Sequence, residues 1–247
     1  TDLTIISLLR SDFAWQNAVY GFTQRAVEMG FLLPTFLLNS VLPALGEQRR
    51  EGQDIAHILR RTLLALLLLS VMMSVPAALL ARPIMALLTT PQYLSTAGIA
   101  GADTAMALLS IPLLVNGVIL FCFYVLLERH RWRPLVAALA VAAVLSLAGN
   151  FLLVPSLGFL GAVIVSIGTH LVLVMLLLPM VSVTGALTIP SSLWLRILLV
   201  GCCEGACALL LRPLMLGPSS TFLGLLLVVA VAGVVAKGMG LLNNRKM

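Results

Sequence analysis

The chain has 247 residues, of which 61% are hydrophobic and only 10% are charged, whereas a soluble domain carries roughly 45–50% apolar and about 25% charged residues. This small number of charged residues cannot cover the surface of a water-soluble globule. The composition therefore excludes a soluble enzyme. The net charge of +6 does not indicate nucleic-acid binding, because the basic residues lie in short clusters beside long apolar runs, where they orient a membrane protein. The composition predicts an integral membrane protein.

Seven stretches are long and apolar enough to cross a bilayer, which takes about 20 helical residues. In chain order we expect spans at 19–44, 62–81, 104–127, 134–154, 159–179, 193–211 and 220–242. A shorter apolar stretch, Leu3 to Leu9, is expected to be the end of a helix that starts before it. The predicted fold class is an all-α membrane bundle of seven to eight helices, forming one domain over residues 1–247.

The distribution of Lys and Arg predicts the orientation, since cytoplasmic loops are enriched in these residues. The basic connections are 45–61 and 128–133, together with the tail after Leu242. The intervening connections carry few bases. We therefore expect these two loops and the C-terminus on the cytoplasmic side. The segment 82–103, with two prolines and several small residues, is expected to be a broken, partly interfacial connection on the outer side.

The first span carries polar residues on one face. At about 100° per residue, Arg25, Glu28, Thr35 and Asn39 fall within about 80° of one another. This stripe is interpreted as the lining of a hydrated cavity, in which the guanidinium of Arg25 would bind an anionic group such as a phosphate. The alternative is that Arg25 and Glu28, three residues apart, only neutralise each other.

Other spans hold isolated polar residues that either line a cavity or bond a neighbouring helix. Asn116 lies in the third span, and Ser146 and Asn150 lie one turn apart in the fourth. His170 and Glu204 are candidates for ion or proton coupling. Glu204 lies among Cys202, Cys203 and Cys207, but no histidine accompanies them, so we expect no metal site.

No catalytic motif is recognisable in the sequence. The phosphate-binding loop, the paired-histidine zinc motif and the nucleophile elbow are all missing. We therefore expect no enzyme activity and no cofactor. A membrane scaffold and an embedded transferase remain as non-transport alternatives, and the one-sided polar stripe of the first span argues against the scaffold.

Three segments resemble one transporter family. The segment 20–25 (YGFTQR), followed by an apolar helix ending in 41–45 (VLPAL), is similar to the eighth helix of bacterial Wzx-type flippases for lipid-linked oligosaccharides. The segments 150–155 (NFLLVP) and 157–162 (LGFLGA) resemble that family's signature between its eleventh and twelfth helices. The segment 82–88 (RPIMALL), with Tyr93 after it, resembles the outer segment that follows the ninth helix.

This resemblance implies a fold and a function. The family belongs to the multidrug/oligosaccharidyl-lipid/polysaccharide exporter superfamily, whose members have fourteen helices in two MATE-like lobes. The chain would be the second lobe, from the end of helix seven through helix fourteen, with a first lobe on the same or a separate chain as its partner. The implied activity is alternating-access transport of a polyprenyl-pyrophosphate-linked oligosaccharide across the bacterial inner membrane.

The resemblance also implies site roles and alternatives. Arg25 would hold a phosphate of the substrate, while Asn39, Asn116 and Asn150 would bind sugar hydroxyls. Membrane lipids and the lipid-linked glycan are then the partners, and nucleic acid is not one. The alternatives within the superfamily are a lipid II flippase of the MurJ type and a cation-coupled multidrug exporter, which would require an acidic residue deep in the cavity.

Overall fold

The computed structural model describes residues 2–50, 56–182 and 191–241. Within that part the chain is all-helical, with 89% of its residues in helices and no strand. The long helices are α2 (Phe13–Arg50), α3 (Ala56–Leu79), α5 (Ala102–Glu128), α6 (Trp132–Leu157), α7 (Phe159–Ser182), α8 (Ser191–Leu211) and α9 (Pro218–Gly238). The short elements are α1 (Asp2–Leu9), α4 (Ala81–Leu88) and the 3-10 turns at Pro91–Tyr93 and Arg212–Leu214.

Six of these helices, α3 and α5 to α9, are long and apolar enough to cross a membrane. They coincide with six of the seven expected spans to within a few residues, except that α3 begins six residues before its span. Many of their large apolar side chains are exposed, as with Leu152 at 75% and Leu210 at 76%. An apolar surface of this extent is suited to lipid rather than water. The chain has the features of a multi-pass helical membrane protein.

The seventh expected span, 19–44, lies within α2 and is not among the six. This helix is 38 residues long and carries Arg25, Glu28 and Asn39 along its length. It also continues through the start of the predicted loop 45–61, and α3 occupies the end of that loop. The connection between α2 and α3 is therefore shorter than predicted, because basic residues do not by themselves end a helix.

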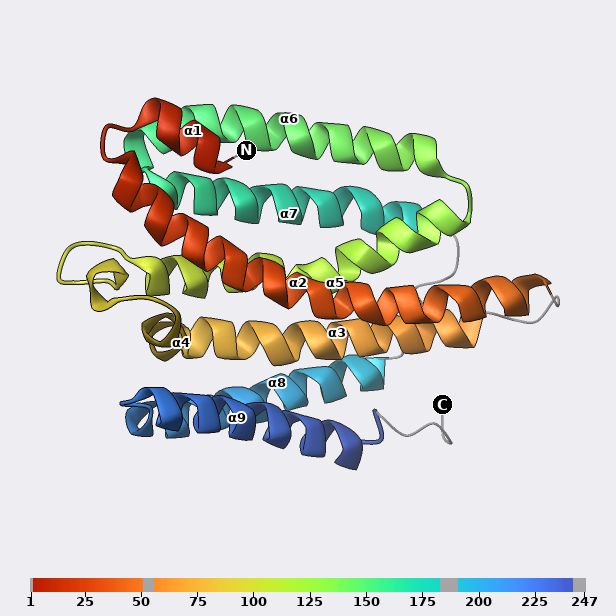
Figure 1. Cartoon of the computed structure of the whole chain (residues 1–247). Helices are drawn as coiled ribbons and strands as arrows, with labels where there is room; N and C mark the ends of the chain where they lie inside the picture. Colours follow the sequence, from red (N-terminus) through yellow and green to blue (C-terminus); the bar gives the residue numbers. More distant parts are fainter. Residues whose placement is uncertain (1, 51–55, 183–190, 242–247) are drawn as a thin grey trace.

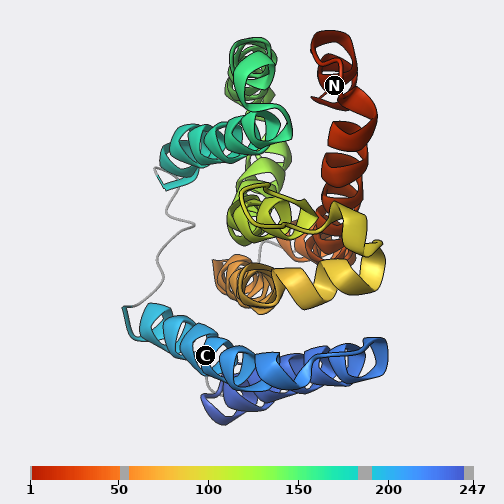
Figure 2. The same cartoon turned by 90° about the vertical axis from the view of Figure 1, so that its left-hand side faces the viewer.

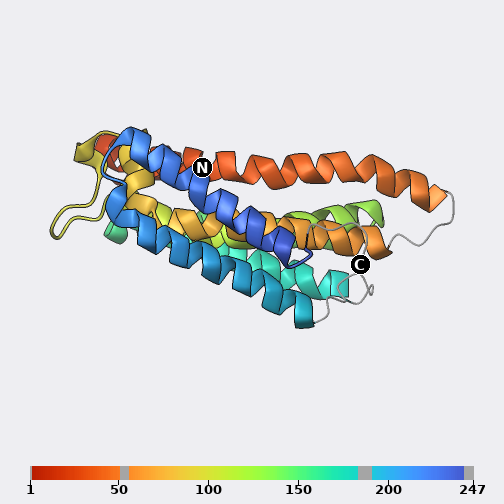
Figure 3. The same ribbon diagram turned by 90° about the horizontal axis from the view of Figure 1, so that it is seen from below.

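The helices form layers (Figure 1). The core is α5, which packs against α3 on one side and against α2 and α7 on the others. The helix α6 packs on α7, and the short α1 lies across α2 and α6. The hairpin of α8 and α9 packs on the far side of α3, away from α6 and α7 (Figures 2 and 3). Two large apolar clusters hold the bundle together, one toward each end of α5.

Polar contacts join the α1–α2 turn to the α6–α7 turn. Arg10 donates from Nε and Nη2 to the carboxylate of Asp12 at 2.9 and 3.1 Å, and from Nη1 to the carbonyl of Pro155 at 3.1 Å. Gln16 donates to Asp12 at 2.9 Å and accepts the backbone N–H of Phe159 at 2.7 Å. We call Arg10, Asp12 and Gln16 the end clamp, since they tie together two turns 145 residues apart in sequence.

Glycine at position 158 is required by this clamp. Gly158 ends α6 with φ +60°, a conformation that side-chain-bearing residues rarely adopt. A Cβ at this position would also lie 2.6 Å from Oε1 of Gln16. Gly158, the first of the two glycines in the 157–162 segment, therefore permits the turn and the close approach of Gln16.

The end clamp predicts both a mutational and a pH effect on stability. We expect Gln16→Leu to destabilise the fold by roughly 1–3 kcal/mol, because the N–H of Phe159 loses its acceptor. The Arg10 and Gln16 hydrogen bonds lower the pKa of Asp12 from 3.8 to about 2. A lowered pKa contributes stability that is present above pH 3.8 and is lost as the pH falls through about 2.

Thermal unfolding of the protein in detergent at several pH values measures both effects. Asp12→Asn should flatten the pH dependence of the unfolding temperature between about pH 4 and pH 2. An acid limb that is unchanged in Asp12→Asn would contradict the assignment to Asp12.

The arrangement of α2 and α6 predicts the topology. The helix α2 ends at the opposite end of the bundle from the end of α6 (Figure 1). Cysteines introduced at Gln48 and Ser156, with the native cysteines removed, should therefore react with a membrane-impermeant maleimide from opposite sides of the membrane. The basic residues of the 45–61 segment predict that Gln48 reacts from the cytoplasm. Reaction of both from the same side would contradict this topology.

Candidate functional site

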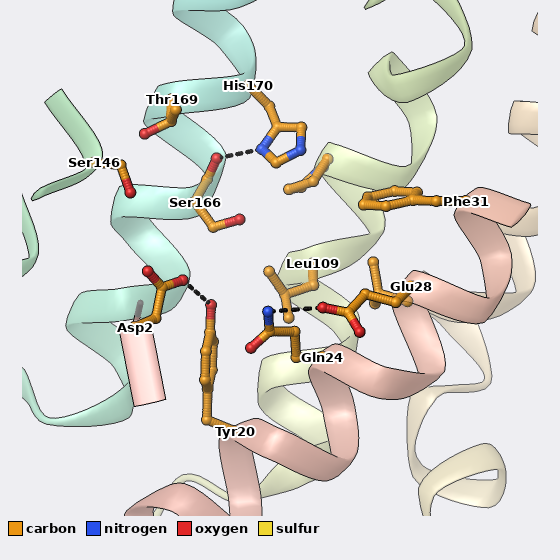
Figure 4. A pocket seen from close by; sticks show the side chains of 12 residues that line it. Asp2, Tyr20, Gln24, Glu28, Phe31, Leu109, Ser146, Ser166, Thr169 and His170 are labelled. Atoms are coloured by element: carbon orange, nitrogen blue, oxygen red, sulfur yellow. Dashed lines mark hydrogen bonds between the residues drawn. The ribbon is translucent and has the colours of Figure 1, made fainter. Parts of the chain in front are cut away.

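A polar cavity of about 190 Å³ lies inside the bundle, between α1, α2, α5, α6 and α7 (Figure 4). Its wall combines carboxylates, hydroxyls, an amide and an imidazole with a few apolar side chains. The lining residues are Asp2, Tyr20, Gln24, Val27, Glu28, Phe31, Leu109, Pro112, Ser146, Ser166, Thr169 and His170. Polar groups from four helices, α1, α2, α6 and α7, meet here within an otherwise apolar bundle. Polar groups in a membrane bundle are costly, so they mark this cavity as a candidate functional site.

Asp2 organises one wall of the cavity. Its Oδ2 accepts the hydroxyl of Tyr20 at 2.8 Å, and its Oδ1 accepts Nδ2 of Asn150 at 3.0 Å. Asn150 also donates to the carbonyl of Ser146 at 2.9 Å, which fixes its orientation. Tyr20 and Asn150 are each 1% exposed, so α1, α2 and α6 are joined by a buried polar network.

The opposite wall is formed by α2. Gln24 donates from Nε2 to Glu28 at 2.9 Å, and both side chains face the cavity (Figure 4). Three buried oxygens around the cavity have no donor in the protein: Oε1 of Gln24, Oδ1 of Asn150 and Oγ1 of Thr169. Two carboxylates and these oxygens form a site suited to a small cation, a hydrated proton or water.

His170 lies at the other end of the same cavity. Its Nδ1 is 2.8 Å from the carbonyl oxygen of Ser166, and its ring lies 6.0 Å from that of Phe31. Because a carbonyl oxygen only accepts, Nδ1 carries the proton in this geometry, and Nε2 is the nitrogen that can take up another. The predicted coupling residue His170 thus lines the same cavity as the carboxyl groups of Asp2 and Glu28.

Arg25 lies at a different surface of α2 from Glu28. Its side chain is exposed and lines a shallow hollow of about 240 Å³ with Leu3, Asn17, Ala18, Gly21 and Phe22. In the part of the chain that the structure describes, no ion pair joins Arg25 to Glu28. Glu28 and Arg25 of the predicted polar stripe thus line two different hollows of α2.

Three further predicted site residues do not line the cavity: Thr35 and Asn39 of the predicted stripe, and Asn116 of the third predicted span. Thr35 donates to the carbonyl of Phe31 at 2.9 Å, within its own helix. Asn39 is exposed and accepts the hydroxyl of Tyr124 at 3.0 Å. Asn116 is 8% exposed on α5, and its Nδ2 has no acceptor in the protein. None of these three residues is among those that line the cavity.

Glu204 is remote from the cavity, on α8, and is 0% exposed. Among the described residues, no three His, Cys, Asp or Glu side chains are grouped so as to hold a metal ion. Cys202 and Cys203 are exposed on α8, and Cys207 is half-buried. The cysteine cluster noted in the sequence therefore does not converge on one site.

Sequence reasoning missed Asp2, Tyr20 and Gln24 as members of the site. The available signal was Asp2 itself, a carboxylate at the start of an apolar helix. Its partners Tyr20 and Asn150 lie 18 and 148 residues away, so their proximity depends on how α1 packs against α2 and α6.

The comparisons with known proteins leave the function to be argued from this geometry. No protein-family model matches the chain, and no curated protein matches it in sequence.

Proposed function

We propose that the chain forms one lobe of a membrane transporter that flips a polyprenyl-pyrophosphate-linked oligosaccharide across the bacterial inner membrane, for the synthesis of cell-surface polysaccharide. The observation that supports this proposal most is the polar cavity inside a bundle of apolar helices. Each unsatisfied polar group in hydrocarbon costs several kcal/mol. A sugar–pyrophosphate headgroup therefore needs a hydrated route, while its lipid chain can stay in the bilayer.

The two hollows on α2 suit different tasks in this proposal. Arg25, on the open side with Asn17, would bind a phosphate of the headgroup. A second lobe would cover this exposed side and complete the substrate site. The polar cavity, with Asp2 and Glu28, would bind a cation or proton whose movement drives the change between inward-open and outward-open states.

A cation-coupled exporter of amphipathic compounds is the second candidate. The observation that favours it is that Asp2 and Glu28 line one cavity, which gives Glu28 the acidic companion that such an exporter requires. A lipid II flippase of the MurJ type would use the same cavity and differ in the sugar it accepts.

Transport in vesicles separates these functions. Proteoliposomes are prepared with the complete transporter, in which the chain is joined by its partner lobe. They are loaded with a fluorescent polyprenyl-pyrophosphate oligosaccharide, with lipid II, or with a cationic dye, and an ion or pH gradient is imposed. The flippase proposal expects the oligosaccharide headgroup to become accessible to an external glycosidase or lectin. Movement of lipid II alone or of the dye alone would favour the corresponding alternative, and movement of none would overturn the transport proposal.

A further inference from the structure

The side chain of Glu204 is enclosed between α3, α8 and α9. It lies one helical turn from Val200 on one side and from Ala208 on the other, and all three side chains are 0% exposed. Val200 packs with Leu68, Ala232 and Ala236, and Ala208 packs with Leu80, Met215 and Val228. Glu204 is therefore located between two apolar clusters.

Small residues bring α8 close to α3 at this level. A Cβ on Gly201 would lie 3.1 Å from Val71, and one on Gly205 would lie 3.4 Å from Leu79 and 3.7 Å from Val75. The α3 side chains that these two glycines approach are therefore all apolar. Neither carboxyl oxygen of Glu204 has a hydrogen-bond partner in the protein.

No described cation faces this carboxyl. The bases on the elements packed around it are Arg196 on α8, Lys237 on α9, Arg82 on α4, Arg212 after α8, and His57, Arg60 and Arg61 at the far end of α3. Arg196 donates to the carbonyl of Met239 at 2.8 Å, and Lys237, Arg82 and Arg212 are exposed. None of these bases forms an ion pair with Glu204 in the described part of the chain.

We propose that Glu204 is a proton-binding site separate from the cavity, and that the α8–α9 hairpin packs on α3 only while this carboxyl holds its proton. A neutral carboxyl can be enclosed by apolar side chains at modest cost, whereas an ionised one without a partner cannot. Ionisation would therefore favour separation of the hairpin from α3, the helix through which α8 contacts the rest of the bundle.

The proton on Glu204 and the packing of the α8–α9 hairpin are independent of which substrate the protein moves. Both are measured without a transport assay, so their failure would leave the proposed function unaffected.

The protonation state is tested with two carbodiimides on the whole protein in membranes. Dicyclohexylcarbodiimide enters apolar sites and adds to a protonated carboxyl, so the stable N-acylurea carries the full mass of the reagent. Mass spectrometry of the digested protein should find this label on Glu204 at neutral pH, and the label should fall about tenfold per pH unit once the carboxyl ionises. A water-soluble cationic carbodiimide should leave Glu204 unlabelled.

The packing is tested by a disulfide between α3 and α8. In a background with the four native cysteines replaced by Ala, Val75→Cys with Gly205→Cys places two thiols on facing helices. Cross-linking should decline at alkaline pH in the protein with Glu204 and should not decline when Glu204→Gln is added. The glutamine variant also controls for the pH dependence of thiol chemistry and should lose the carbodiimide label completely.

Three results would overturn the proposal. One is the absence of dicyclohexylcarbodiimide label on Glu204 at neutral pH, which would mean an ionised carboxyl. Another is efficient labelling by the water-soluble reagent, which would mean an exposed one. The third is cross-linking with the same pH dependence in the Glu204 and Glu204→Gln proteins, which would remove the link between the proton and the hairpin.

Discussion

Arg25→Ala is expected to abolish transport of the lipid-linked oligosaccharide at normal protein abundance. In the proposed function this guanidinium binds a phosphate of the headgroup, and no other described base lines the same hollow. Arg25→Lys should keep part of the activity, because the charge persists while the two-pronged geometry is lost. The measurement is the rate at which the headgroup becomes accessible in the vesicle assay, normalised to the amount of protein.

The control variants for Arg25 separate substrate binding from simple charge balance. Arg82→Ala removes another exposed arginine from the chain and should transport normally. If Arg25 only neutralised Glu28, the double variant Arg25→Ala with Glu28→Ala would transport nearly as well as the unchanged protein. We expect the double variant to stay inactive, since the two side chains line different hollows. Recovery of transport in it would refute the phosphate-binding role.

Asp2→Asn is expected to slow gradient-driven transport by about ten- to a hundredfold. The substitution keeps the size of the side chain but removes the charge that the cavity presents to a cation or proton. A hydrogen bond or contact to a charged group contributes roughly 1.5–3 kcal/mol, and each 1.4 kcal/mol corresponds to about a tenfold change. The measurement is the transport rate with and without an imposed ion or pH gradient.

Tyr20→Phe is the matched control for Asp2. It removes the 2.8 Å hydrogen bond to Asp2 but leaves the carboxylate and its bond from Asn150 in place. We expect a small loss of rate and an unchanged response to the gradient. If Asp2→Asn responds to the gradient as the unchanged protein does, the cavity is not the coupling site.

The spanning helices could be predicted from the sequence because length and apolar content determine them. Six of them were located to within a few residues at nearly every end. The extent of α2 could not be predicted in this way. Its apolar residues end near residue 45, and charged and polar residues follow. The backbone nevertheless stays helical through Arg50, because glutamine and arginine are good helix formers.

The candidate site could be predicted only in part. Helical periodicity correctly indicates that Arg25 and Glu28 lie about 60° apart, but not that a cavity wall passes between them. The cavity requires Asp2 to meet Tyr20 and Asn150, and this depends on which helices become neighbours. A single sequence holds little information on which helices become neighbours. In the structure, the packing of α1 against α2 and α6 brings Asp2 to Tyr20 and Asn150.

The length of α2 has a mechanical consequence. A helix of 38 residues extends about 57 Å, nearly twice the roughly 30 Å hydrocarbon thickness of a bilayer. The cavity residues Tyr20 to Phe31 lie in its first half. In the second half, Leu38 is buried with residues of α3 and α5, and Asn39 accepts the hydroxyl of Tyr124. One continuous helix thus connects the cavity with these contacts and with Arg50, so a change in what occupies the cavity would be transmitted along α2 to the far end of the bundle.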